Sequence, residues 1–234
     1  MKFSGRFATL IMAVCLCWHA AAFASEDAYL YLVHGVPGRD VSTTVDPTLP
    51  VDVQLNDKIC YLHGFSFGSI NGPLTLPPGQ YDIKISPANT LTPCTNEPFI
   101  DSNVSLEGSQ NVTAVIALNG SGSPVLSTFG NDFQPVADGE ARLSVDYAGE
   151  NSPIELLVRS SSTSKTIKYM INPGEKQLIT LPAGSYSIQA KVGSVTLASQ
   201  VIGLPQRSVT LLFAVGNTAN QSLSFVSKTV RDVL

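Results

Sequence analysis

The chain has 234 residues, of which 44% are hydrophobic and 14% charged, and its formal net charge is −4. Its Lys and Arg residues are scattered rather than clustered. This argues against nucleic acid or an anionic membrane surface as a partner, because both require basic patches. The length fits two domains of about 100 residues each.

The N-terminal segment is predicted to be a secretory signal peptide covering residues 1–24. Lys2 and Arg6 supply its positive region, Leu10–Trp18 its apolar region, and Ala22–Ala24 a small-residue cleavage site. No apolar stretch reaches the roughly 20 residues of a membrane-spanning helix. We therefore expect no transmembrane segment and a periplasmic or secreted mature protein. Its net charge would be −6, since cleavage removes two positive charges from −4.

The cysteines predict one disulfide. Cleavage removes Cys15 and Cys17 and leaves Cys60 and Cys94 in an oxidising compartment. A single pair there is more often bridged than free, so we predict a Cys60–Cys94 bond. The alternative is two unrelated thiols. A lipid anchor would need small residues directly before Cys15 or Cys17, and the residues there fit that pattern poorly.

Runs of aliphatic and β-branched residues, broken at short intervals by Gly, Pro, Asn and Asp, predict an all-β fold. In Val51–Leu55 apolar and polar residues alternate, which indicates one packed and one solvent-facing side. Ala114–Leu118 is apolar on both sides and suits a central strand. The first half is expected to contain the strands Tyr29–His34, Val51–Leu55, Ile59–Phe65, Ile70–Leu76, Tyr81–Ser86, Phe99–Leu106 and Val112–Leu118.

The second half repeats the first. Leu76–Ile83 returns as Leu181–Ile188, displaced by 181 − 76 = 105 residues, and each copy carries a Leu-Pro-x-Gly-x-Tyr turn. A period this long makes each copy a whole domain. Two further matches pair Val51–Leu55 with Ile154–Val158 and Val112–Ala117 with Val209–Ala214. The strands expected here are Ala141–Asp146, Ile154–Arg159, Thr166–Ile171, Lys176–Leu181, Tyr186–Lys191, Val195–Ile202, Ser208–Val215 and Leu223–Val226.

These patterns predict an all-β protein with two tandem immunoglobulin-like antiparallel β-sandwich domains. Seven short strands in about 100 residues are typical of such a sandwich. The first domain is expected at residues 25–130 and the second at 140–234. The intervening residues, 131–139, read as a short linker.

Several segments of the first copy resemble the domain-of-unknown-function 4397 family, which is found in exported bacterial proteins. The resemblance rests on Val33-His34, Val51–Val53, Gly64–Gly68, Leu74–Ile83 and Val112–Val115, and extends more weakly to the second copy. It implies a fold, and it carries no established activity or catalytic residues. The usual compact Ser-Pro-Asp-Ala-Pro turn after the Val-His pair is replaced here by a longer loop that begins at Gly35.

Two expanded loops in the first copy are the candidate contact site. His34 and Val51 are 51 − 34 = 17 positions apart, whereas the matching interval in the second copy, from Asp146 to Ile154, is 154 − 146 = 8. The second expansion runs from Pro87 to Pro98. Alternating strands would place both loops at one end of the sandwich, where binding residues concentrate. Tolerated surface insertion is the alternative. The candidate contact residues are His34, Arg39, Asp40, Asp46, Asn96 and Glu97.

Gly64-Phe65-Ser66-Phe67-Gly68 matches the nucleophile elbow of hydrolases, which requires a strand, a sharp turn and then a helix. The residues after Ser66 read instead as another strand. Every histidine precedes Ser66, so the order Ser, acid, His is excluded, although His, Asp, Ser remains open with His34 or His63 and Asp57. We expect a structural turn.

Metal binding is not expected, because compact ligand spacing is missing. His34 and His63 with Asp40 or Asp46 would make a zinc site only if the fold brought them together. A calcium site would draw on loop oxygens but lacks the spacing of an EF-hand loop. Its candidate ligands are Asp40, Asp46, Asp101, Asn96 and Glu97.

The sequence therefore predicts an exported, non-enzymatic binding or structural module of the cell envelope or extracellular space. We expect no cofactor, and the expected partner is a protein or polysaccharide of the cell envelope. The alternative is a periplasmic assembly chaperone, which also has two immunoglobulin-like domains and pairs an exposed strand with its client. A secreted serine hydrolase is a third reading that depends on Ser66 alone.

Overall fold

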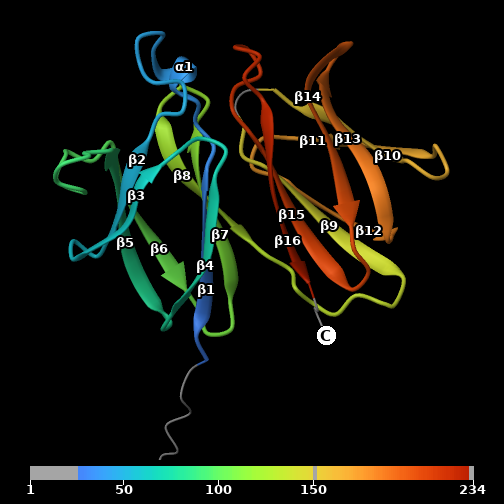
Figure 1. Cartoon of the computed structure of the whole chain (residues 1–234), viewed down its shortest axis with the longest axis horizontal. Helices are drawn as coiled ribbons and strands as arrows, with labels where there is room; N and C mark the ends of the chain where they lie inside the picture. Colours follow the sequence, from blue (N-terminus) through green and yellow to red (C-terminus); the bar gives the residue numbers. More distant parts are fainter. Residues whose placement is uncertain (1–25, 150–151, 232–234) are drawn as a thin grey trace, which may run out of the picture.

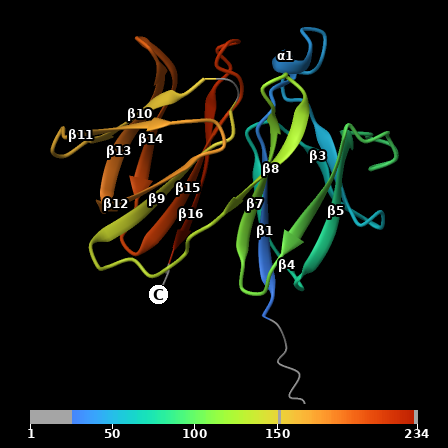
Figure 2. The same ribbon diagram turned by 180° about the vertical axis from the view of Figure 1, so that it is seen from behind.

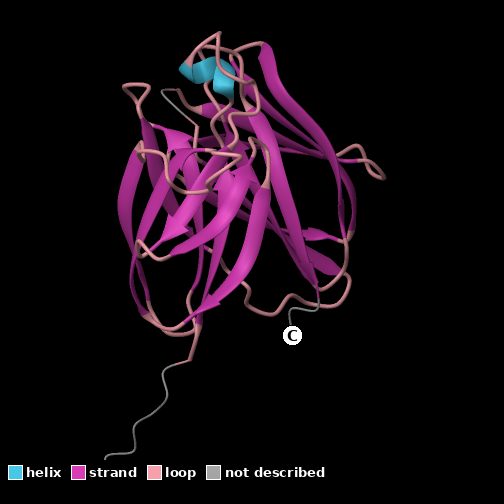
Figure 3. Ribbon diagram, turned by 60° about the vertical axis from the view of Figure 1, so that its left-hand side comes forward, coloured by secondary structure: helices cyan, strands magenta, loops and turns pink. Residues whose placement is uncertain are grey.

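The computed structural model describes residues 26–149 and 152–231, so the predicted signal peptide lies outside the described residues. These described residues form sixteen strands and one short helix, and Figure 3 shows the helix at one end of an otherwise β-rich molecule. The first half contains β1 (Ala28–His34), α1 (Gly38–Val41), β2 (Val51–Leu55), β3 (Ile59–Phe65), β4 (Ile70–Leu76), β5 (Gly79–Pro87), β6 (Ile100–Leu106), β7 (Asn111–Leu118) and β8 (Pro124–Gly130). The second half contains β9 (Glu140–Tyr147), β10 (Ile154–Ser160), β11 (Thr166–Ile171), β12 (Lys176–Pro182), β13 (Gly184–Val192), β14 (Val195–Leu204), β15 (Ser208–Val215) and β16 (Ser224–Arg231).

The strands form four sheets, two in each half. The first half has the sheets β4-β1-β7-β8 and β3-β2-β5-β6, and the second has β12-β9-β15-β16 and β11-β10-β13-β14. The two halves therefore share one strand order, with each strand of the second half matching the strand eight places earlier. The predicted fold class, two tandem β-sandwiches, is confirmed.

The connectivity within each sandwich differs from the immunoglobulin order. Immunoglobulin domains place strands A, B, E and D in one sheet and C, F and G in the other. Here the first strand lies between the fourth and the seventh, and it runs parallel to the seventh in both halves. The first half also has an eighth strand, β8, which the sequence did not predict because Gly, Ser, Thr and Pro interrupt its apolar residues.

Each sandwich has its own core, and a third apolar cluster lies between the two sandwiches. Figure 1 shows the four sheets side by side, with β4-β1-β7-β8 facing β12-β9-β15-β16. Val115 of β7 and Leu211 and Phe213 of β15 are buried in this shared cluster. The approach is close, since a Cβ at Gly35 would lie 2.8 Å from Cγ1 of Val215. This second contact explains why the central strands are apolar on both sides.

The contact between the sandwiches also buries a carboxylate. Asp146 of β9 is fully buried, lies 3.2 Å from Nζ of Lys176 and accepts a hydrogen bond from Ser144 Oγ at 3.3 Å. Burial raises the pKa of Asp146 to about 6, and the Lys176 cation and the hydrogen bond from Ser144 only partly oppose this. The same Lys176 ammonium group donates to the carbonyl oxygen of Gly130 at the end of β8.

The structure shows which residues of the two copies are equivalent, because equivalent side chains face the core of each sandwich. Ile116 of β7 and Ala214 of β15 face their own cores, and each carbonyl accepts a backbone hydrogen bond from the residue after the first strand, Gly35 or Ala148. The offset between β7 and β15 is therefore 214 − 116 = 98, one residue more than the letter match of Val112 with Val209 indicates. The letter match was misleading because these strands are apolar on both faces.

The same backbone bonds make Tyr147, not Asp146, the counterpart of His34. Both side chains are fully buried, and each donates a hydrogen bond to a carbonyl just before the second strand. His34 Nε2 lies 2.8 Å from Leu49 O, and Tyr147 Oη lies 2.9 Å from Ser152 O. In both copies a proline and the second strand follow that carbonyl. The repeat thus conserves a contact while changing the residue that makes it.

The repeated turn has the same geometry in both copies. Tyr81 donates a hydrogen bond to Pro77 O and Tyr186 to Pro182 O, each at 2.7 Å. Each ring folds back over the turn that precedes the fifth strand of its sandwich. The strongest sequence match therefore reflects one shared local structure.

We expect Phe213→Ala to lower the free energy of unfolding by about 3–5 kcal/mol, because it removes a fully buried ring from the cluster between the sandwiches. Scanning calorimetry should then show the two sandwiches unfolding in separate transitions. The control is Val201→Ala, whose side chain is 69% exposed. A Phe213→Ala profile identical to that of the control would contradict a stabilising contact between the sandwiches.

Candidate binding site at the loop end of the first sandwich

Three connections of the first sandwich meet at the end that carries α1 (Figure 1). The β1–β2 loop bonds to the β3–β4 turn, with Phe67 N donating to Thr48 O at 2.7 Å. It also bonds to the start of the β5–β6 loop, where Ala88 N donates to Pro50 O at 3.0 Å. We call this set of connections, residues 35–50, 66–69 and 88–99, the loop end.

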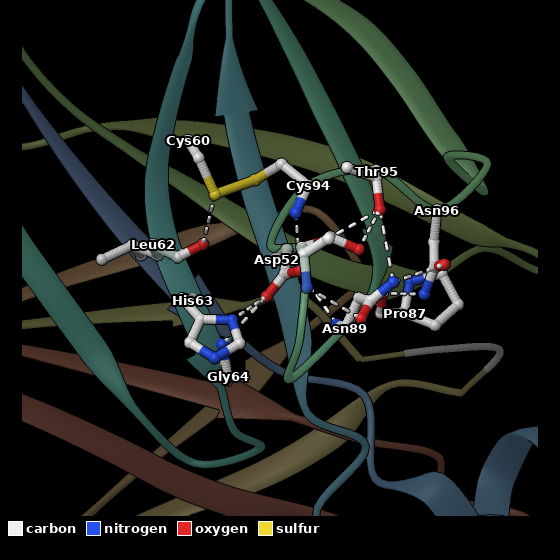
Figure 4. Close-up of a disulfide and its surroundings, with 11 residues drawn as sticks. Asp52, Cys60, Leu62, His63, Gly64, Pro87, Asn89, Cys94, Thr95 and Asn96 are labelled. Carbon is white, nitrogen blue, oxygen red and sulfur yellow. Dashed lines mark hydrogen bonds and ion pairs between the residues drawn. A yellow bond between two sulfur atoms is a disulfide. The ribbon is translucent and has the colours of Figure 1, made fainter.

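Asp52 anchors the β5–β6 loop to the sheet beneath it (Figure 4). One carboxylate oxygen accepts from Nδ1 of His63 at 2.7 Å and from Gly64 N at 3.1 Å. The other accepts from Asn89 N at 3.0 Å and Cys94 N at 2.8 Å. The strand alternation of β2 predicts that Asp52 faces solvent, and this is wrong, because the β5–β6 loop covers that side and buries Asp52 completely.

The loop lies in this position because a disulfide ties it to β3. Cys60 and Cys94 are bonded, with their Cα atoms 5.7 Å apart, which confirms the predicted pairing. Cys60 follows the hairpin at the opposite end of the sandwich, so the loop must fold along the outer face of the sheet to reach it. That path carries Asn89 and Cys94 over Asp52 (Figure 4).

The carboxylate of Asp52 is kept ionised by its donors. Burial alone would raise its pKa, but the backbone N–H groups of Cys94, Asn89 and Gly64 and the His63 ring outweigh burial and leave the pKa below its ordinary value. A group with a lowered pKa in the folded state stabilises the fold above its unfolded pKa. That contribution disappears as the pH falls through the folded value.

The tip of the β5–β6 loop presents an apolar side chain to solvent. Oδ1 of Asn89 accepts hydrogen bonds from the N–H groups of Leu91 and Thr92, both at 3.1 Å, and closes a tight turn. The Leu91 side chain is 90% exposed. In the same loop, the hydroxyls of Thr92 and Thr95 lie 2.9 Å apart. Because a disulfide and a buried carboxylate fix this loop, the exposed Leu91 is held in place before any partner binds.

The candidate residues of this loop are near one another. Asn96 Nδ2 donates to Pro87 O at 3.0 Å, and Asn89 Nδ2 donates to Asn96 Oδ1 at 3.3 Å. Glu97 is exposed beside Asn96. Leu91 is the residue that the sequence interpretation missed, because no sequence signal separates an exposed leucine from a buried one without the path of the loop.

The candidate residues of the β1–β2 loop have different surroundings. His34 is buried, and its Nδ1 accepts from Val36 N at 3.3 Å while Nε2 donates to Leu49 O. Burial lowers the pKa of His34 to about 4, although the bond to Leu49 opposes this. Asp46 is exposed and accepts from Thr48 N and Oγ1 at 2.8 and 2.7 Å, which lowers its pKa.

Arg39 and Asp40 contact the second sandwich. The Asp40 carboxylate accepts hydrogen bonds from Ser222 Oγ and, at 3.1 Å, from Asn220 Nδ2. Arg39 Nη2 donates to Gln221 O at 3.4 Å. These residues belong to the β15–β16 connection, so the long β1–β2 loop bridges the two sandwiches and supplements their apolar contact.

Ser66 stands in a turn between two strands. It follows β3, its hydroxyl donates to Gly64 O at 3.2 Å, and β4 begins at Ile70, so no helix follows the turn. His63 points to Asp52 (Figure 4). Within residues 26–149 and 152–231, no three His, Cys, Asp or Glu side chains gather as metal ligands would. In the same ranges, no helix is long and apolar enough to cross a membrane.

We expect Asp52→Asn to release the β5–β6 loop, because an amide offers its NH₂ group to backbone donors that need an acceptor. The free energy of unfolding should fall by about 2–4 kcal/mol. Hydrogen exchange at Asn89 and Cys94 should accelerate with the disulfide intact. Asp101→Asn is the control, since that side chain is 58% exposed in the same sheet. Unchanged exchange at both amides would contradict the anchoring role of Asp52.

The buried, neutral His34 should make stability pH-dependent. The unfolded state gains a proton near pH 6.5 and the folded state only near 4, so stability is lost as the pH falls between these values. We expect the His34 contribution to fall by about 2 kcal/mol between pH 7.5 and pH 5. The measurement is the difference in unfolding free energy between the wild type and His34→Gln, in which the opposite effect of Asp146 cancels. A difference that is constant with pH would contradict this.

Comparison with known proteins gives one family and distant structural likenesses. No curated protein matches the chain. Among solved structures, the TIE protein of Bacillus anthracis matches 82% of this chain at 11% identity and a TM-score of 0.27, and this chain spans only 34% of its length. A Bacteroides ovatus ATCC 8483 protein, provisionally described as a cell adhesion protein, matches 89% of this chain and 98% of its own at 7% identity and a TM-score of 0.29.

The family match agrees with the resemblance noted in the sequence. It covers residues 28–153, more than half of the chain, and includes the whole first sandwich, the connection to the second and β9. The described family is "Domain of unknown function (DUF4397)". The chain therefore belongs to the DUF4397 family.

Proposed function

We propose that the protein is an exported, non-enzymatic binding module of the cell envelope or extracellular space, and that the loop end of the first sandwich is its contact surface. The observation that carries the proposal is the fixed β5–β6 loop with Leu91 at its tip. A loop that is ordered before binding pays little conformational entropy on contact. A binding residue exposed on a rigid scaffold is the usual arrangement of such sites.

The disulfide supports export, because such bonds persist in oxidising compartments outside the cytoplasm. The polar groups around Leu91 belong to Asn, Thr and Glu side chains, which suit hydrogen bonding at the rim of an interface. The partner that fits is a protein or polysaccharide of the cell envelope. The strand after Ser66 and the engagement of His63 with Asp52 support a non-enzymatic role.

The test compares Leu91→Ser with Val201→Ser, a change at another strongly exposed apolar residue on the second sandwich. The probe is the insoluble cell-envelope fraction of the producing organism, and a glycan array serves as the second probe. We expect Leu91→Ser to weaken binding at least about tenfold and the control to leave it unchanged. Equal binding by both variants would contradict a contact surface at the loop end.

Ser66→Ala separates binding from hydrolysis. A binding module should retain full binding when the hydroxyl is removed, because the turn keeps its backbone. Any ester or amide hydrolysis that the wild type shows and Ser66→Ala lacks would overturn the non-enzymatic assignment.

A further inference from the structure

The β11 strand is an exposed edge of the second sandwich (Figure 2). Within the described part of the chain it pairs with β10 alone, in a register that is unbroken from Thr166 to Ile171. On the other side of β11, the described residues provide no strand partner for its backbone N–H and C=O groups. An unpaired edge with an unbroken register is a template for another strand.

The counterpart in the first sandwich is protected. Its strand β3 has two register irregularities along β2, near Val53, and carries the disulfide at Cys60. The neighbouring edge β4 contains Pro73, which lacks an N–H group. On the opposite side of the second sandwich, the edges β14 and β16 contact each other. The unpaired edge of β11 therefore distinguishes the second sandwich from the first, whose equivalent edge has register shifts and carries the disulfide.

A groove lies beside this edge, where β11 and β12 diverge. It has a volume of about 340 Å³, and its apolar lining includes Val158, Ile167, Leu181 and Tyr186. The connection between β10 and β11 contributes hydroxyl groups and Lys165 to its rim. An extended strand added to β11 would direct alternate side chains toward this groove, because successive side chains of a strand point to opposite faces.

The charge at this end of β11 is positive in a chain whose net charge is −4. Arg159 and Lys165 flank the turn between β10 and β11, with Lys165 at the rim of the groove and Arg159 on the other face of the sheet, and neither makes an ion pair with the residues that the structure describes. Five other basic residues among the described ones make ion pairs, as Lys176 does with Asp146 and Arg142 with Asp132. Two unpaired cations at one end of an open edge favour an acidic occupant.

We propose that β11 is the docking edge for an extended acidic segment of another protein, which adds a strand to the sheet β11-β10-β13-β14. Main-chain hydrogen bonds to β11 supply affinity, an apolar side chain enters the groove, and acidic side chains face Arg159 and Lys165. This surface lies on the second sandwich and is independent of the loop end of the first.

The experiment follows backbone amide exchange and NMR shifts of the full mature chain with three short peptides. One alternates valine and threonine with glutamate at both ends, the second has lysine at both ends, and the third is the acidic peptide with a central proline. We expect only the first to protect the β11 amides. Protection by the basic or the proline peptide to the same extent, or shifts confined to the loop end, would overturn the proposal.

Charge reversal tests the acidic preference. Lys165→Glu should weaken binding of the acidic peptide about tenfold, whereas Lys58→Glu should not change it. Lys58 is the matched control, since it lies in the equivalent turn between β2 and β3 of the first sandwich. Equal affinity for both variants would overturn the assignment. Protection of β11 that rises with protein concentration in the absence of peptide would overturn it in favour of a second copy.

Discussion

The contact between two sheets, one from each sandwich, determines most of the architecture. The sheets β4-β1-β7-β8 and β12-β9-β15-β16 are covered on both faces, so their central strands cannot carry polar side chains without partners. Asp146 shows the consequence, since its burial there requires Lys176 and raises its pKa. The two outer sheets have no such restriction. The loops, cations and exposed apolar residues that differ between the two copies lie on these outer sheets.

The two copies share a framework and differ in what is added to it. Both fix the end of the first strand by a hydrogen bond to the carbonyl before a proline, through His34 in one and Tyr147 in the other. The first copy then adds a bridging loop, a disulfide and a covered carboxylate. The second keeps short connections and an open strand edge. Duplication followed by unequal elaboration is a simple account of one chain with two distinct surfaces.

The sequence was sufficient for every described strand except β8, for the tandem repeat and for the disulfide, because each leaves a local or compositional signal. The Cys60–Cys94 pairing could be predicted from the number of cysteines left after the predicted cleavage. The turn before Tyr81 could be predicted from its repeated sequence motif. Asp52 was misread because alternation reports which side of a strand a residue occupies, and not whether a distant loop covers that side. The loop that covers it is more than thirty positions away in sequence.

The alignment of β7 with β15 that the sequence predicted was wrong for a related reason. When both faces of a strand are buried, a slip of one residue exchanges apolar for apolar, so letters alone cannot detect it. The sequence also did not indicate that Leu91 is exposed or that Arg39 and Asp40 contact the second sandwich. The position of Leu91 depends on the disulfide and on Asp52, and that of Arg39 and Asp40 on contacts with the β15–β16 connection, and neither leaves a local pattern in the sequence.

The central position of β1 has a consequence for how the chain folds. Its neighbours β4 and β7 both come later in sequence, and Tyr29 pairs with Asn111, a separation of 111 − 29 = 82 residues. A chain that emerges from its N-terminus therefore cannot complete its first sheet until nearly all of that domain is available. Pairing over such separations is slow. The first strand of the domain is thus one of the last to find both of its neighbours, so the topology that makes the finished domain stable also delays its formation.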